Sequence, residues 1–288
     1  MDYLKKYKKM IGLRNLSEHT AKSYMTYIKT YFEYIGIIGK YPSQVTAKDL
    51  QAYIVWLKET RNLADRTINA AISQVRFFTL YVLGKPWDPF AIPFRKFDTY
   101  LPFVPTISET REFISTISDL RIKTMVSIMY SSGLRIGEVC HLRYEDISRR
   151  NMRIHIPHGK NRSDRYAILS KSALDLLTKY WFSYGKPIGY LFPQIHNPDK
   201  PIDTFYLSRH IHEHEDRLGW PRRLTCHSFR HAFGTHLYQN GTDLVTLRAL
   251  MGHKSLNSTL IYVHLSVNGN DSATSPLDLM EGFNDGED

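Results

Sequence analysis

The sequence predicts a mainly α-helical chain of two domains, with a small β-hairpin in the second. Three observations indicate this architecture: apolar residues recur at three-and-four spacing through residues 17–84, prolines interrupt all periodicity between residues 84 and 106, and apolar and polar residues alternate near residues 152–156 and 166–170. A chain of 288 residues has room for two cores of ordinary size. We therefore expect domains at residues 1–95 and 106–265, a linker at 96–105 that prolines stiffen, and an acidic tail at 266–288.

The first domain is expected to be all helical. Ser17 is a usable N-cap for a helix whose apolar stripe is closed by Gly36. The segment Thr46–Asp49 has the form of a capping box and opens another helix. A further apolar stripe runs from Ile68 to Gly84, where glycine ends it.

The chain carries a formal net charge of +10 on an ordinary apolar content of 42%. This balance is typical of a globular protein with a basic face, so the expected partner is an extended polyanion. Simple solubilising charge is the alternative. The candidate DNA contacts of the first domain are Lys22, Lys29, Arg66 and Arg76. Each of them is equally well explained as part of a solvated face.

Cysteine usage and hydropathy indicate where the chain works. Only Cys140 and Cys226 are present, which is too few for a disulfide framework in a chain of this length. A reducing cytoplasm fits best. Neither a secretory leader nor a run of about eighteen apolar residues occurs, so we expect neither secretion nor a membrane span.

The second domain opens with helices that lead to a notable arginine. Thr106–Glu109 is another capping box, and an apolar helix from Ile122 breaks at the glycine after Ser132. Arg135 follows this break, beside residues that would face the core. An arginine there is expected to have an anionic partner, either a ligand or a carboxylate such as Glu138 or, further along the chain, Asp146.

A small hairpin follows. Residues 152–156 alternate between apolar and polar, and Tyr166 and Ile168 continue the alternation after a polar turn. Lys160 and Arg162 lie in this turn, where they could enter a groove or remain solvated. The turn is not a phosphate-binding P-loop, because the spaced upstream glycine and the following Ser or Thr are missing.

Several histidines suggest a metal site, which we reject. Of His210, His212 and His214, only the first and last share a face of the helix expected there, so a surface helix is the better interpretation. His227 and His231 also share a face, but Ser-Phe-Arg separates them instead of the Glu-x-x of a zinc protease. We predict no metal.

The stretch from residue 225 to residue 262 is richest in reactive side chains. Thr225 can cap a helix on which His227 and Arg230 lie one turn apart on the same face, within reach of one phosphate. A second helix ends at a glycine that delivers His253 at a turn, and Tyr262 follows on a third, short helix or turn. Cationic and hydrogen-bonding groups around a phenol are what phosphoryl transfer without a metal requires.

In their order and separations, six residues resemble the tyrosine recombinase (phage integrase) family: Arg135, Lys160, His227, Arg230, His253 and Tyr262. The likeness extends to Gly133-Leu-Arg-Ile-Gly-Glu138, Phe229-Arg-His-Ala-Phe-Gly-Thr-His236 and Leu250-Met-Gly-His-Lys-Ser255. It covers essentially the whole chain, whose helical first part is similar to the family's core-binding domain and whose length is close to that of Xer-type enzymes. The resemblance implies a two-domain DNA clamp that acts as a site-specific recombinase.

The resemblance also implies residue roles. Arg135 and Arg230 would clamp the scissile phosphate, because guanidinium groups offer forked donors to phosphate oxygens. His227 and His253 would donate to the same oxygens as charge grows in the transition state. Tyr262 would attack phosphorus and form a 3′-phosphotyrosine link, after losing its proton to a base such as His227.

Lys160 would protonate the departing 5′ oxygen. The turn reads Gly-Lys-Asn-Arg where family hairpins often read Gly-Lys-Gly, so Arg162 is the alternative acid. No cofactor is expected, because the broken phosphodiester is stored as another phosphodiester. The implied partners are double-stranded DNA core sites and three further copies of the chain, a homotetramer on two DNA sites, with or without a partner recombinase or accessory protein.

Two other functions remain open. A type IB topoisomerase-like enzyme would use similar chemistry but reseal the same strand. A DNA-binding regulator with this fold would have lost catalysis, although the presence of all the site residues speaks against it. Whether the task is integration, excision, inversion or resolution is also open. The tail from Ser266 lacks Lys and Arg, and a short helix in it could dock on a neighbouring protomer or be disordered.

Overall fold

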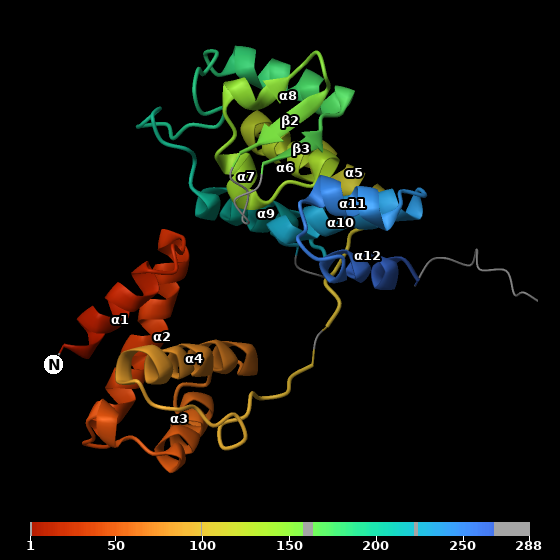
Figure 1. Cartoon of the computed structure of the whole chain (residues 1–288). Helices are drawn as coiled ribbons and strands as arrows, with labels where there is room; N and C mark the ends of the chain where they lie inside the picture. Colours follow the sequence, from red (N-terminus) through yellow and green to blue (C-terminus); the bar gives the residue numbers. More distant parts are fainter. Residues whose placement is uncertain (1, 99, 158–163, 222–223, 268–288) are drawn as a thin grey trace, which may run out of the picture. The chain divides into compact units, whose positions relative to one another are not determined.

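The computed structural model describes residues 2–98, 100–157, 164–221 and 224–267. Contacts divide the chain into two compact units, Met1–Tyr100 and Leu101–Asp288 (Figure 1). The predicted fold class, mainly helical with a small sheet in the second unit, is confirmed. No helix in these ranges is long and apolar enough to cross a membrane.

The first unit is a helical bundle. Its helices are α1 (Tyr3–Gly12), α2 (Glu18–Ile37), α3 (Ala47–Glu59) and α4 (Asp65–Phe78), and a π-helical turn (Thr79–Leu83) extends α4. Ser17 caps α2 and Thr46 caps α3, both as predicted. The predicted end at Gly36 is wrong, because α2 continues through Ile37 and the chain reverses at Gly39, whose φ of 66° suits glycine. Tyr31, Tyr53 and Phe78 fill the core with edge-on and tilted ring contacts.

The second unit packs its helices around two central ones, α6 and α10. In chain order its helices are α5 (Ile107–Thr116), α6 (Leu120–Ser132), α7 (Ile136–Cys140), α8 (Lys171–Ser183), α9 (Thr204–Leu218), α10 (Cys226–Gln239), α11 (Leu244–Met251) and α12 (Asn257–Val267). α10 packs against α5, α6, α11 and α12 (Figure 1). As predicted, Thr225 caps α10, and Gly133 and Gly252 end α6 and α11 in the left-handed conformation.

The sheet has three antiparallel strands rather than a lone hairpin: β1 (Ile147–Ser148), β2 (Arg153–Ile156) and β3 (Arg165–Ile168), in that order. Ile154 pairs with Ala167, and both are buried. The predicted phase of β3 is wrong. Arg165 and Ala167 face inward, whereas Tyr166 is 63% exposed. On the inward side Arg165 pairs with the carboxylate of Glu138, whose side chain is 10% exposed.

Two predictions about polar and sulfur-bearing side chains can be compared with the core. Cys140 and Cys226 are both buried as free thiols. The view of α9 as a surface helix is only partly right. His214 is buried, contacts the Phe113 ring edge-on at 4.8 Å and lies 2.9 Å from the Thr116 hydroxyl. Burial also lowers its pKa.

Candidate active site

Five of the six predicted catalytic residues lie in the described part of the chain, and four of them come together. Arg135 is the N-cap of α7, Arg230 lies on α10, His253 follows α11, and Tyr262 lies on α12. His227 begins the same face of α10, with an exposed side chain. Lys160 and Arg162 lie outside the described residues.

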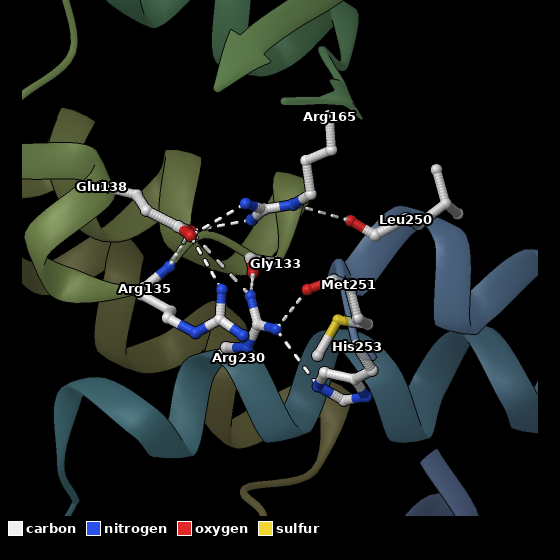
Figure 2. Close-up of polar contacts among 8 residues, drawn as sticks. All are labelled: Gly133, Arg135, Glu138, Arg165, Arg230, Leu250, Met251 and His253. Atoms are coloured by element: carbon white, nitrogen blue, oxygen red, sulfur yellow. Dashed lines mark hydrogen bonds and ion pairs between the residues drawn. The ribbon is translucent and has the colours of Figure 1, made fainter. Parts of the chain in front are cut away.

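Arg230 is the centre of the site. Its side chain is 4% exposed, and its Nη1 donates to the Gly133 carbonyl at the end of α6. Its Nη2 donates to the Met251 carbonyl at 2.5 Å and lies 3.2 Å from His253 Nε2 (Figure 2). Burial and then the nearby Arg135 lower its pKa to about 10, so it stays charged at neutral pH. One guanidinium thus links the ends of α6 and α11.

Arg135 is fixed by the carboxylate of Glu138, one of its two predicted partners. Arg135 donates to Glu138 twice, from its backbone N–H and from Nη1, each at 2.8 Å. Asp146, the other predicted partner, instead lies 3.6 Å from His155. The Arg135 side chain remains 20% exposed, so part of its donor fork is available to a ligand.

A second arginine holds the same carboxylate, and the sequence did not single it out. Arg165 of β3 makes two hydrogen bonds to Glu138, at 2.8 and 2.7 Å, and its Nε donates to the Leu250 carbonyl at 3.2 Å (Figure 2). Burial acts to raise the pKa of Glu138, but the hydrogen bonds from Arg165 and Arg135 lower it to about 2. The apolar pattern of β3 gave no signal for this residue, because it placed Tyr166 and Ile168, and not Arg165, on the inward side.

His253 and Tyr262 form a stacked pair. Their rings are 6.2 Å apart and 8° from parallel. His253 Nδ1 lies 3.0 Å from the Thr259 hydroxyl, which fixes the ring so that Nε2 faces Arg230. Burial and Arg230 lower the pKa of His253 to about 4, which makes it neutral at pH 7. A neutral imidazole can donate one hydrogen bond without adding charge.

The candidate nucleophile is buried. Tyr262 is 1% exposed, and its ring lies against the backbone of Gly234 on α10. Burial raises its pKa to about 12, while Arg230 and Arg135 act to lower it. Loss of the phenolic proton therefore depends on those cations and on a base.

His231 joins the predicted residues on α10. Its ring is 6.1 Å from the Tyr262 ring and 6.2 Å from that of His227. Burial lowers its pKa to about 4, with His227 adding to the shift. Among the described residues no group of three His, Cys, Asp or Glu side chains could hold a metal ion. The described site therefore offers guanidinium groups, imidazoles and a phenol.

The four candidate DNA contacts of the first unit all lie on its surface. Lys22 forms an ion pair with Glu18 at 2.8 Å, and Arg66 lies over the Phe97 ring. Lys22 and Lys29 line an open groove of about 690 Å³ between α1 and α2. Arg61, in the same unit, forms an ion pair with Glu33 at 2.7 Å.

Comparison with known proteins gives two family matches. Residues 106–268 match the model described as the phage integrase family, and residues 3–89 match the phage integrase N-terminal SAM-like domain. A protein of Sinorhizobium fredii that carries the provisional name integrase/recombinase is 31% identical over 93% of this chain and 86% of its own. Tyrosine recombinase XerC of Leptospira interrogans is 26% identical over 88% of this chain and 85% of its own.

Solved structures share the fold. The Tn1549 transposon integrase in complex with circular intermediate DNA matches with a TM-score of 0.73 and 19% identity, covering 91% of this chain and 95% of that one. The XerH site-specific recombinase bound to its difH substrate matches with a TM-score of 0.71 and 20% identity, over 88% and 79% of the two chains.

Proposed function

Because this chain belongs to the phage integrase family and is a site-specific recombinase, we propose that it cuts and rejoins DNA through a 3′-phosphotyrosine link formed by Tyr262. The family resemblance predicted from the sequence is thereby confirmed. The observation that carries the chemistry is the convergence of Arg230, His253 and Tyr262, which come from α10, the end of α11 and α12.

Arg135 and Arg230 are the proposed clamp for the scissile phosphate. Both are fixed by hydrogen bonds before DNA arrives, so little reorganisation is needed when charge grows on the phosphoryl oxygens. His253 Nε2 accepts from Arg230 in the free site; in the other neutral tautomer, with the proton on Nε2 and Nδ1 accepting from the Thr259 hydroxyl, His253 would supply one more donor to the phosphate. A single well-placed donor of this kind contributes roughly 3 kcal/mol to the transition state.

Tyr262 attacks phosphorus through its phenol oxygen. Because burial raises its pKa to about 12, its proton must be taken by a base, and His227, at the exposed start of α10, is the proposed base. The 5′ oxygen then leaves with a proton from Lys160, which lies outside the described residues, with Arg162 as the alternative donor. Attack by a 5′ hydroxyl from a second duplex reverses the step and completes strand exchange.

The proposed partners are double-stranded core sites held by four copies of the chain. Related proteins of this fold have been captured on DNA, as in the XerH complex with difH. The exposed cations Lys22, Lys29, Arg66 and Arg76 are the proposed contacts of the first unit with the DNA backbone. Two free cysteines agree with action in a reducing cytoplasm.

Covalent capture tests this proposal. The protein is mixed with fragmented DNA from its host, the reaction is stopped with detergent, and DNA that stays attached to protein is sequenced. We expect attachment at a defined site with wild type and none with Tyr262→Phe. Equal attachment by both proteins would refute the assigned nucleophile. Recombinant joints between two duplexes that carry the recovered site would exclude simple resealing as the sole activity.

A further inference from the structure

We infer that Arg165 is a positioning residue that occupies the Glu138 carboxylate and so keeps the charges of Arg135 and Arg230 available to the scissile phosphate. This inference rests on the proposed function of the site. Arg165 lies on β3, outside the set of residues that the sequence suggested.

The geometry places one carboxylate among three guanidinium groups. Glu138 accepts two hydrogen bonds from Arg165 and two from Arg135, and Arg230 Nη1 lies 4.0 Å from Glu138 Oε2 (Figure 2). Arg165 uses its planar fork, the arrangement in which a guanidinium pairs most strongly with a carboxylate. The side chains of Glu138 and Arg165 are 10% and 8% exposed, so water screens this pair weakly.

Charge balance explains why the third arginine matters. Three guanidinium charges and one carboxylate charge leave two positive charges in the described cluster. A phosphodiester carries one negative charge, and attack by a phenolate adds a second to the pentacoordinate phosphorus. Without Arg165 the cluster would carry one net positive charge, and Glu138 would compete with the phosphate for Arg135 and Arg230.

Arg165 also joins the elements that carry the site. Its Nε donates to the Leu250 carbonyl in the last turn of α11, two residues before Gly252. An added Cβ at Gly252 would lie 2.6 Å from Arg165 Cδ, and the glycine has a φ of 62°. The Arg165 side chain therefore packs directly beneath the turn that presents His253.

The test separates charge from packing. Arg165→Gln keeps a hydrogen-bond donor but loses the charge, whereas Arg165→Lys keeps the charge and loses the fork. Each variant is assayed for the rate of Tyr262–DNA adduct formation in a single turnover, for DNA affinity and for thermal unfolding, on the site recovered by covalent capture. Arg153→Gln on β2 is the matched control, because Arg153 is exposed on the neighbouring strand.

We expect Arg165→Gln to slow adduct formation by roughly 10²-fold, the loss typical of one transition-state donor, with DNA affinity unchanged. Arg165→Lys should lose much less, and Arg153→Gln nothing. Adding Glu138→Gln to Arg165→Gln should restore most of the rate, since removal of both charges returns the cluster to two positive charges. A purely structural role predicts no rescue, because the double variant lacks both partners.

The inference is overturned if the double variant is no faster than Arg165→Gln, or if Lys and Gln at position 165 are equally slow. If Arg165→Gln does not fold, the comparison moves to the Glu138→Gln background. There the substitution at position 165 should have little effect on rate, and a large loss would refute the inference. If wild type itself forms no Tyr262-dependent adduct, the proposed function fails and this inference with it. An adduct without rescue refutes this inference alone.

Discussion

Gly234 supports the nucleophile, so adding one methyl group there should slow cleavage. An ideal Cβ at position 234 would lie 2.5 Å from both Cε1 and Cζ of Tyr262. Non-bonded carbons prefer about 3.5–4.0 Å, so Gly234→Ala must push the phenol ring away by about 1 Å. Since a misplacement of about 1 Å can cost 10²-fold in rate, we expect adduct formation to fall by roughly that factor.

Stability should change much less than activity. Overpacking a buried site costs about 1–3 kcal/mol, whereas replacing a helical glycine by alanine returns about 0.5–1 kcal/mol. The net loss of unfolding free energy should therefore be about 1–2 kcal/mol, visible in chemical denaturation of a protein that still folds and binds DNA.

The assay is single-turnover formation of the covalent DNA adduct, measured beside DNA affinity. Gly36→Ala is the matched control, because Gly36 is also helical and has open space around its Cα. It should leave cleavage unchanged and raise stability slightly. If Gly234→Ala cleaves DNA at the wild-type rate, the contact between the Tyr262 ring and α10 does not position the phenol for attack.

Three further predictions address pH, DNA binding and the core. His231 and His253 have pKa values of about 4 against an ordinary 6.5, so between these pH values the unfolded chain binds more protons and stability falls as pH falls. Each histidine should lower the free energy of unfolding by roughly 1–2 kcal/mol by pH 4, after allowance for partial exposure. His231→Gln should therefore make the urea-denaturation midpoint depend less steeply on pH. An unchanged slope would contradict this. Arg76→Gln should reduce the slope of log DNA affinity against log salt concentration by about one. Arg61→Gln, which removes an ion-paired side chain, should change the slope less. Equal effects would argue against Arg76 as a contact with the DNA backbone. His214→Ala should lower the unfolding free energy by about 2 kcal/mol, because a buried ring and its hydrogen bond are lost. The folded variant should form the DNA adduct at the wild-type rate. Slower cleavage by a fully folded variant would contradict a purely structural role for His214.

Local signals in the sequence determined most of the helices. Capping residues Thr46, Thr106 and Thr225 fixed where helices begin, because a side chain beside the first turn satisfies N–H groups that have no helical partner. Gly133 and Gly252 fixed where two helices end, since glycine takes the left-handed conformation without strain. These signals involve residues within a few positions of one another, which is why they could be predicted.

The spacing of reactive residues also identified the family and proposed the nucleophile, but their environments depended on distant contacts. The sequence predicted an anionic partner for Arg135 and left Glu138 and Asp146 as alternatives. The structure shows Glu138, three residues on in the first turn of α7, as the partner, and it adds Arg165, which reaches the same carboxylate from a strand 27 positions further along. Arg165 faces inward and Tyr166 outward, against the apolar pattern of β3.

Only the tertiary structure decided how the nucleophile is held. Tyr262 is buried because α12 packs its ring onto Gly234 of α10, and its raised pKa is a consequence of that packing. Burial and charge are properties of everything within a few ångströms of a group, and those neighbours come from four helices and a strand. The sequence by itself determined which groups are available for the chemistry, and the fold decided their ionisation and the orientation of their side chains.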